Sequence, residues 1–261
     1  MGNNDIEMTF GGHLEALRQM LLRIISVAGF FAVAVFCFKD TTWSVLLAPS
    51  EWDFCTYRWI ESLARSIGFT DFHFEEYHIN LITTDLSAQF MMHITTSVYL
   101  GLLCASPFVL YELFRFITPA LYENEKKYSV QIAVVIYALF ILGVLMTYYI
   151  LFPISFRFLG TYSVAERIHS TITLDSYVET FTSLTLMMGV VFQLPVIAFI
   201  LAKMRLITYG ILSEYRKHAF ILILLLAAVI TPPDVMTLLI VTVPLYMLYE
   251  VSIKIVRFVE K

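Results

Sequence analysis

The sequence AFILILLLAAVI (Ala219–Ile230), the tetrad TPPD (Thr231–Asp234) and the sequence VMTLLIVTVPLYMLY (Val235–Tyr249) decide the fold of this chain. Both apolar runs are too hydrophobic for the surface of a soluble protein. At about 1.5 Å per residue they would span roughly 18 and 22 Å as helices, whereas the hydrocarbon core of a bilayer is about 30 Å thick. The sequence therefore predicts a hairpin of two short membrane helices, which would thin the bilayer locally.

The composition places the whole chain in a membrane. Hydrophobic residues make up 59% of it and charged residues only 15%, and the mean hydropathy is +0.78. A soluble domain of ordinary composition does not reach these values. The net charge of −4 and the lack of a clustered basic stretch in the sequence argue against nucleic acid as a partner.

Four longer apolar segments precede the hairpin, and each is near or above the roughly 20 residues that a spanning helix requires. We predict an all-α, polytopic membrane protein with six transmembrane helices, the last two short, at residues 20–38, 86–114, 128–152, 177–202, 219–230 and 235–251. No repeat or linker divides the sequence, so we expect a single membrane domain over residues 1–261. A cleaved signal peptide is the alternative for the first segment, but the apolar run continues through Phe38 and favours an uncleaved helix.

The distribution of Lys and Arg predicts the orientation, because positive residues are retained in the cytoplasm. An even number of spans puts both termini on one side, and that side carries twelve of the 17 positive residues. We therefore expect cytoplasmic termini and external loops at 39–85, 153–176 and 231–234. The first external loop is acidic, and its segment 58–66 has the pattern of a helix.

Catalytic and metal-binding patterns are missing from the sequence. It contains no HExxH, GxSxG, Walker A or GxGxxG motif. The six histidines are scattered, and the closest pair, His73 and His78, lacks a convincing third ligand. We expect no enzymatic activity, no metal and no cofactor.

The sequence SPFVLYELFRFITPALYENEKK (Ser106–Lys127) is the most telling connection between two spans. One interpretation is a solvated turn whose charges satisfy the positive-inside rule. The other is an acidic docking site for guanidinium groups, to which a carboxylate offers bidentate hydrogen bonds. The residues alone leave both interpretations open.

This segment resembles the first cytoplasmic loop of the TatC family, the receptor subunit of the twin-arginine protein translocase. A pattern near SxPxxxYQxWxFxxPxLYxxERR is characteristic of that family, and this chain matches it at Pro107, Tyr111, Phe116, Pro119, Leu121, Tyr122 and Glu125. Three further stretches agree in order, namely HLEALR from His13, FQLP from Phe192, and TPPD followed by Pro244 and Glu250. The resemblance runs from His13 to about Phe258.

The resemblance implies a multi-pass protein of the bacterial cytoplasmic (inner) membrane that binds Arg-Arg signal peptides and exports folded precursors with the proton-motive force. The implied partners are these precursors and a TatA-type single-span protein, with a TatB-type partner left open, in a complex that holds several copies. We expect the signal peptide to bind at Glu15, Glu112, Phe116, Pro119, Leu121, Tyr122, Glu125, Lys126 and Lys127.

Two departures from the family pattern concern these carboxylates. The family motif HLxELR has its acid at the position of Ala16, whereas this chain has Glu15 one place earlier. One residue turns a helix by about 100°, so Glu15 presents its carboxylate to a different side. Glu112 replaces a common Gln, and we hypothesise that it restores the acidity lost at Ala16. The simpler interpretation of Glu112 is an ion pair with Arg115, three residues further on.

Three other positions are candidates for translocation or structure. Gln193 is a polar residue in the fourth apolar segment, where it either forms an interhelical hydrogen bond or takes part in translocation; an amide cannot titrate, so it is no proton relay. Pro49 and Asp234 match positions that the family uses on its external face, and we expect Asp234 mainly to cap the helix after it. We expect Pro153 and Pro244 at a helix terminus and a kink.

Two other classes of function compete with this interpretation. A secondary transporter of small solutes would also have Pro-interrupted helices and a buried polar residue, but it predicts an inverted repeat that the sequence does not show. An intramembrane enzyme needs a nucleophile and a base at one depth. Ser106 and His93 could be proposed, but they are thirteen residues apart on one helix.

Overall fold

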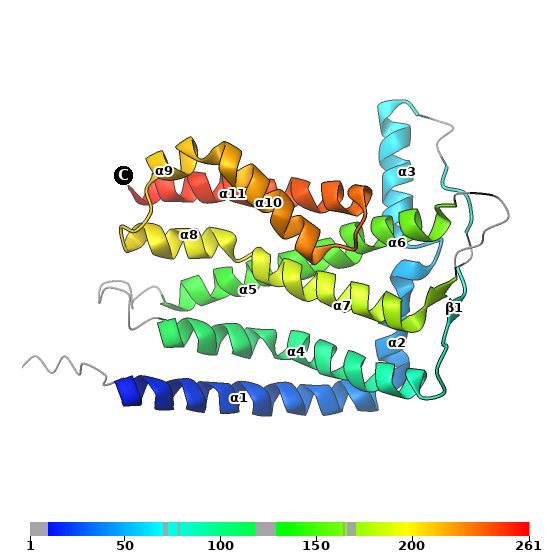
Figure 1. Ribbon diagram of the computed structural model, residues 1–261, viewed down its shortest axis with the longest axis horizontal. Coiled ribbons are helices and arrows are strands. Elements are labelled where there is room, and N and C mark those ends of the chain that lie inside the picture. Colours follow the sequence, from blue (N-terminus) through cyan, green and yellow to red (C-terminus); the bar gives the residue numbers. More distant parts are fainter. Residues whose placement is uncertain are drawn as a thin grey trace, which may run out of the picture. The chain divides into compact units, whose positions relative to one another are not determined.

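The computed structural model describes residues 10–69, 73–77, 79–117, 129–163, 165 and 171–260. Nearly all of them lie in helices (Figure 1), which confirms the all-α prediction. Within these ranges the extended elements are two short strands, β1 (Leu81–Ile82) and β2 (Ile172–Thr173). They pair in parallel, with Leu81 opposite Ile172.

The contacts divide the chain into two compact units, one of Met1–Cys37 with Ser97–Tyr137 and one of Phe38–Thr96 with Ala138–Lys261. Unit 1 contains α1 (Phe10–Cys37), most of α4 (Ala88–Ile117) and the first half of α5 (Ser129–Met146). Unit 2 contains the start of α4, the end of α5 and both strands. It also contains the remaining helices, which are α2 (Lys39–Leu47), η1 (Ala48–Ser50), α3 (Cys55–Ile67), η4 (Thr147–Leu151), α6 (Phe152–Thr161), α7 (Leu174–Val191), α8 (Leu194–Lys203), α9 (Tyr209–Glu214), α10 (Arg216–Ile230) and α11 (Val235–Val259). The single membrane domain over residues 1–261 stays a prediction.

Among the described residues, five helical stretches are long and apolar enough to cross a bilayer. They cover Leu14–Cys37, Ala88–Phe116, Ile132–Thr161, Leu174–Lys203 and Val235–Val259. Large apolar side chains along them are exposed, including Phe30 at 71% and Val33 at 66%. Such side chains suit contact with lipid. The chain is thus a polytopic helical membrane protein, while the count of six spans and the side of the termini stay predictions.

In unit 1, α1 and α4 approach closely at Gly101. A Cβ atom placed on this glycine would lie 2.5 Å from the Cα of Ala32. Gly101 and Ala105 are both buried and lie four residues apart on one face of α4. Small residues at this spacing let membrane helices pack backbone against backbone. The absence of a side chain at Gly101 therefore sets how closely α4 approaches α1.

The core of unit 2 is aromatic. Phe152 of α6 meets Tyr177 and Phe181 of α7 edge to face, with ring centroids 5.1 and 5.0 Å apart, and Phe156 meets Tyr177 at 5.1 Å. All four rings are buried. The Tyr177 hydroxyl also donates to the carbonyl oxygen of Leu46 at 2.7 Å. The cluster therefore holds α6 against α7 and attaches the end of α2 to both.

Pro153 lies at a helix terminus as predicted, in the first turn of α6, but the span does not end at residue 152 as expected. The chain passes from α5 through the π-helical turn η4 directly into α6, which ends at Thr161. Proline lacks the N–H that would bond the carbonyl four residues earlier, which is that of Tyr149. The hydroxyl of Thr56 in α3 donates to this carbonyl instead. A side chain from a distant helix thus satisfies the freed acceptor, and the helix continues.

The predicted span 177–202 consists of two helices. The end of α7 at Val191 and the start of α8 at Leu194 are separated by a turn at Phe192 and Gln193. Pro195 lies in the first turn of α8. Its ring clashes with the carbonyl of residue 191 and supplies no N–H, so the helical ladder cannot run through.

The second helix of the predicted hairpin is longer than expected, whereas the first is short, as predicted. With 15 residues, α10 is about 22 Å long, shorter than the hydrocarbon core. By contrast α11 has 25 residues and continues well beyond 251. Glu250 lies within this helix, and its Oε1 atom is 3.0 Å from the Nε atom of Arg216 in α10. The predicted turn at 231–234 lies between the two helices as expected.

Two other boundaries differ from the predictions. The first helix begins at Phe10 and not at residue 20, because the polar residues before the apolar run continue the helix. The predicted loop 39–85 contains α3, which confirms the helix at 58–66, and also α2. The polar start of α2, Lys39–Thr42, is typical of a loop, so the sequence did not indicate this helix.

Candidate functional site

The structure describes part of the predicted signal-peptide site. Outside the described residues lie Pro119, Leu121, Tyr122, Glu125, Lys126 and Lys127. Phe116 is half-buried near the end of α4. Glu15 in α1 and Glu112 in α4 both belong to unit 1. The described part of the candidate site is therefore the first half of α1 and the last turns of α4.

Glu112 is buried, with only 5% of the residue exposed. The Nη1 atom of Arg23 in α1 donates to both of its carboxylate oxygens, at 3.3 and 3.4 Å. The Nη1 atom of Arg115 lies 3.8 Å from Oε1, so the predicted pair with Arg115 is present and is the longer of the two. Removing a partner from a buried carboxylate is costly. Glu112 therefore ties α4 to α1.

Arg23, the partner of Glu112, lies on the same face of α1 as Ala16, the position at which the family motif has its acidic residue. Ala16, Met20 and Arg23 follow an i, i+4, i+7 spacing and so share one face of the helix. Met20 is buried, Ala16 is half-buried and the Arg23 side chain is 47% exposed, so this face lies at the edge of the packing in unit 1. Glu112 reaches this face through Arg23. Arg23 is not among the predicted site residues, although its spacing from Ala16 is a signal that could have identified it.

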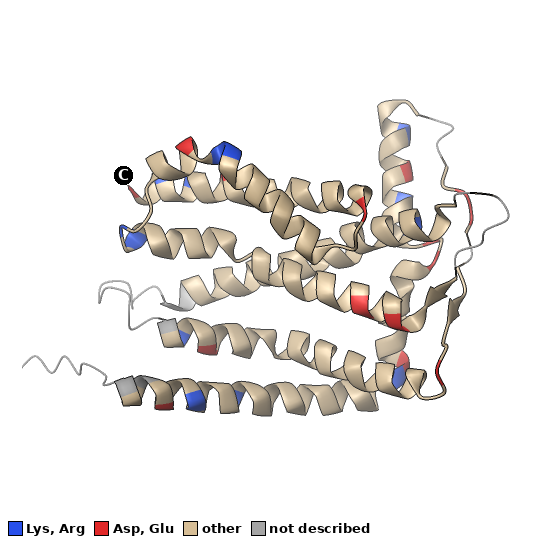
Figure 2. Ribbon diagram, viewed as in Figure 1, with Lys and Arg blue, Asp and Glu red and all other residues tan. Residues whose placement is uncertain are grey.

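Glu15 lies on the exposed side of α1, and its side chain is 52% exposed. Its contacts come from the same helix: the Nη1 atom of Arg18 at 3.4 Å and the Nε2 atom of Gln19 at 3.2 Å. Exposed pairs of this kind contribute at most about 1 kcal/mol, so another cation can displace them. Figure 2 shows charged residues in the first half of α1 and the last turns of α4, with the rest of α1 uncharged.

Asp234 caps α11, as predicted. Its Oδ1 atom accepts the backbone N–H of Thr237 at 2.6 Å. Pro49 is buried in η1, directly after α2. Gln193 lies at the break between α7 and α8, and its Nε2 atom donates to the carbonyl of Gly189 in α7 at 3.4 Å. A part for these three residues in translocation stays a prediction.

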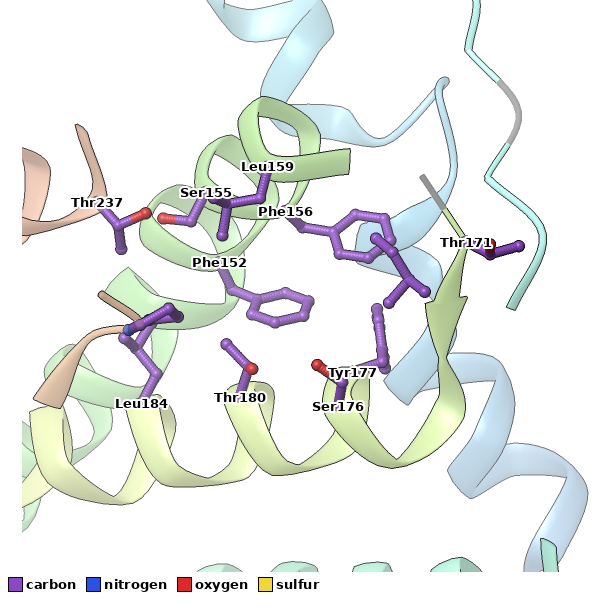
Figure 3. Close-up of a pocket in the computed structure, with 12 residues that line it drawn as sticks. Phe152, Ser155, Phe156, Leu159, Thr171, Ser176, Tyr177, Thr180, Leu184 and Thr237 are labelled. Carbon is purple, nitrogen blue, oxygen red and sulfur yellow. The ribbon is translucent and has the colours of Figure 1, made fainter. Parts of the chain in front are cut away.

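A pocket of about 280 Å³ lies in unit 2 between α6, α7 and the turn before α11. Figure 3 shows the hydroxyls of Ser155 and Thr237 directed toward one another, with Phe152 and Phe156 nearby. Both hydroxyls are buried and form no hydrogen bond within the described part of the chain. Because buried hydroxyls require a partner, this pocket is suited to ordered water. The sequence did not indicate it, since its hydroxyls lie in otherwise apolar helices.

A second cluster that the sequence did not indicate surrounds Arg157 at the end of α6. Its guanidinium carbon lies 4.4 Å from the ring centre of Phe74, 4.7 Å from that of Tyr77 and 5.1 Å from that of Tyr57. Its Nη2 atom also donates to the carbonyl of Glu75 at 2.7 Å. Arginine over aromatic faces is a favourable contact. Arg157 therefore fastens residues 73–77 and α3 to the end of a membrane helix.

Comparison with known proteins agrees with these observations. The family described as Sec-independent protein translocase protein (TatC) matches residues 12–244. The Sec-independent protein translocase protein TatC of Blattabacterium sp. subsp. Periplaneta americana is 33% identical over 100% of this chain and 99% of its own length. The protein of the same name from Carboxydothermus hydrogenoformans is 29% identical over 98% of this chain and 96% of its own length.

Solved structures show the same architecture. A crystal structure described as the twin-arginine translocase receptor TatC superimposes with a TM-score of 0.75 and 27% identity. The superposition includes 95% of this chain and 100% of the crystallised chain. A second crystal structure of that receptor, obtained in DDM, gives a TM-score of 0.74 and 28% identity over 93% of this chain and 98% of its own.

Proposed function

Because this chain belongs to the TatC family of Sec-independent protein translocase components, we propose that it is the receptor for twin-arginine signal peptides. Precursors that carry such a peptide arrive folded, and the protein passes them across the bacterial inner membrane with the proton-motive force. The match to a family model over residues 12–244 supports this proposal, as do relatives that align over the whole chain. We further propose that it works in a complex of several copies with TatA-type and, where present, TatB-type partners.

The observation that carries the proposal is the exposed carboxylate of Glu15 in unit 1. Glu15 is exposed on α1, and Glu112 is buried on α4 against Arg23. Helix α4 leads directly into the segment with Glu125, Pro119, Leu121 and Tyr122. Two adjacent guanidinium groups of a signal peptide need two carboxylates with free acceptor sites. We propose that Glu15 and Glu125 supply them.

Glu112 has a different part in this proposal. Two arginines already neutralise its carboxylate, so it has little capacity for a third guanidinium. It acts instead as a positioning residue, which holds the end of α4 against the Ala16 face of α1. In this way it brings a carboxylate to the face on which the sequence lacks one at Ala16, although Arg23 and Arg115 balance its charge. Phe116, Lys126 and Lys127 complete the proposed surface.

Export of a folded reporter tests the proposal in cells that lack their own TatC. Wild-type chain should export a reporter with an Arg-Arg signal and should fail with a Lys-Lys signal. Glu15→Gln should lower export, whereas Glu214→Gln, an exposed carboxylate of α9, should leave it unchanged. Equal export of the Arg-Arg and Lys-Lys reporters, together with unchanged export by Glu15→Gln, would refute the proposed receptor role.

The role of Glu112 can be tested separately. Glu112→Gln removes the charge but keeps the size, so Arg23 loses its ion pair. We expect a lower affinity for the signal peptide together with a lower melting temperature of the protein, because α1 loosens from α4. Unchanged affinity in this variant would show that Glu112 does not support the site.

A further inference from the structure

A second pocket of unit 2 lies beside the starts of two membrane spans. It has a volume of about 370 Å³ and is lined by Lys39, Trp43, Leu47, Gln89, Phe90, His93 and Leu174. The span of α4 begins at Ala88 and that of α7 begins at Leu174. The pocket therefore lies at the boundary between hydrocarbon and headgroups, in the size range of small-ligand sites.

Its polar side chains come from two helices at helical spacing. Lys39 and Trp43 are four residues apart on α2, and Gln89 and His93 are four apart on α4. Residues four apart lie on the same face of a helix, so each helix turns two polar groups into the pocket. The pocket is thus a built arrangement of two facing helix surfaces.

Three of these side chains have hydrogen-bond donors that the protein leaves available. Within the described ranges, the ammonium of Lys39, the indole N–H of Trp43 and the amide of Gln89 form no hydrogen bond or ion pair with another residue. The lining also contains no Asp or Glu as far as the chain is described, and the neighbouring carboxylates Asp40 and Asp175 are outside it. The chemistry therefore favours an anion.

The remaining walls are apolar. Leu47, Phe90 and Leu174 line the same space, and Phe90 is 61% exposed. A ligand that satisfies both parts has a negatively charged head and a hydrocarbon tail. Trp and Lys at a membrane boundary are also the usual contacts of lipid headgroups.

We propose that this pocket binds one anionic phospholipid, whose phosphate accepts from Lys39, Trp43 and Gln89 while an acyl chain lies along Phe90. The site is distinct from the proposed signal-peptide surface in unit 1, and it does not depend on that proposal. Bound lipid would join the starts of α2, α4 and α7 at the membrane boundary. We infer this class of ligand from the unpaired ammonium of Lys39, the neutral donors of Trp43 and Gln89, and the apolar wall of the pocket.

Native mass spectrometry of the delipidated, full-length protein tests the proposal. Dioctanoyl phosphatidylglycerol and dioctanoyl phosphatidylcholine have the same chains and phosphate but differ in net charge. We expect the wild type to prefer phosphatidylglycerol about fivefold, the factor that corresponds to about 1 kcal/mol per lysine at a membrane surface. Lys39→Gln should lose this preference, and Lys39→Arg should keep it.

Lys254→Gln is the matched control, since it removes an exposed lysine from α11 and should retain the preference. Inorganic phosphate in excess distinguishes the two sources of the anion. If it competes as well as phosphatidylglycerol does, the pocket is a phosphate site and the lipid proposal is wrong. Equal binding of both lipids by the wild type, or an unchanged preference in Lys39→Gln, would also overturn it.

Discussion

Tyr149 and Pro153 show how single residues determine the course of a helix in this protein. Because Pro153 has no N–H, the carbonyl of Tyr149 lacks its usual helical donor. The hydroxyl of Thr56, in a different helix, donates a hydrogen bond to it instead. The sequence predicts that a carbonyl is freed, because the spacing of four residues is fixed. It does not predict which residue satisfies it, since Thr56 lies ninety-three positions away.

The Thr56 hydroxyl is therefore expected to stabilise the fold. Thr56→Val keeps the shape but leaves the Tyr149 carbonyl without its donor, which should cost about 1–3 kcal/mol. Thr56→Ser keeps the hydroxyl and should stay close to the wild type. Thermal unfolding in detergent measures both, and equal melting temperatures for the Val and Ser variants would refute the role.

Asp234 offers a second prediction at this scale. Asp234→Ala removes the acceptor of the Thr237 N–H and should destabilise the protein by about 1 kcal/mol. Asp234→Asn retains a capping oxygen and should be nearly neutral for stability. If export fails in Asp234→Asn while its melting temperature is unchanged, the carboxylate has a part in translocation beyond the cap.

At the scale of elements, the packing of α1 against α4 depends on Gly101. A side chain there would meet the backbone of Ala32, which cannot move aside like a flexible side chain. Gly101→Val should therefore cost about 1–3 kcal/mol through overpacking. Gly29→Ala is the control, because a Cβ at Gly29 meets nothing within 4 Å. Melting temperatures of the two variants in detergent test this, and a Gly101→Val variant as stable as Gly29→Ala would contradict the packing.

The cluster around Arg157 should respond to alkaline pH. Burial raises the pKa of the Tyr57 and Tyr77 phenols above the ordinary value of 10.0. The Tyr57 hydroxyl also donates to the carbonyl of Pro153 at 2.8 Å. Because the folded state raises these pKa values, their contribution to stability is complete below about pH 10 and is lost as the pH rises beyond it.

Limited proteolysis across a pH series, with an alkali-tolerant protease, measures this change. Cleavage within residues 73–77 should increase above pH 10 and should be flat between pH 7 and 9. Tyrosinate absorbance should rise at higher pH than for free tyrosine. A segment that becomes cleavable below pH 9 would contradict the assignment.

For the molecule as a whole, the sequence predicts the class of fold, and the resemblance predicts the family, because hydropathy and ordered motifs are local signals. The sequence does not predict ion pairs between residues that are far apart along the chain. Arg216 pairs with Glu250 from 34 residues away, and Arg23 pairs with Glu112 from 89 residues away. The segment with Glu125 lies outside the described residues, so its part of the site stays a prediction.

The short helix α10 makes a prediction for transport. At about 22 Å it is shorter than the hydrocarbon core, so it should thin the bilayer locally. Inserting four leucines into α10 should lower export while signal-peptide binding persists. The same insertion after the exposed Ser163 should leave both unchanged. Normal export with the longer α10 would count against thinning.

The central claim is that this chain recognises paired arginines through carboxylates. Binding of a labelled Arg-Arg signal peptide to the purified protein in nanodiscs tests it most directly, beside a Lys-Lys peptide and a Glu125→Ala variant. We predict tight binding that is lost in both comparisons, because bidentate guanidinium–carboxylate pairs distinguish Arg from Lys. Equal binding in all three would mean that the chain keeps the family fold without this recognition chemistry.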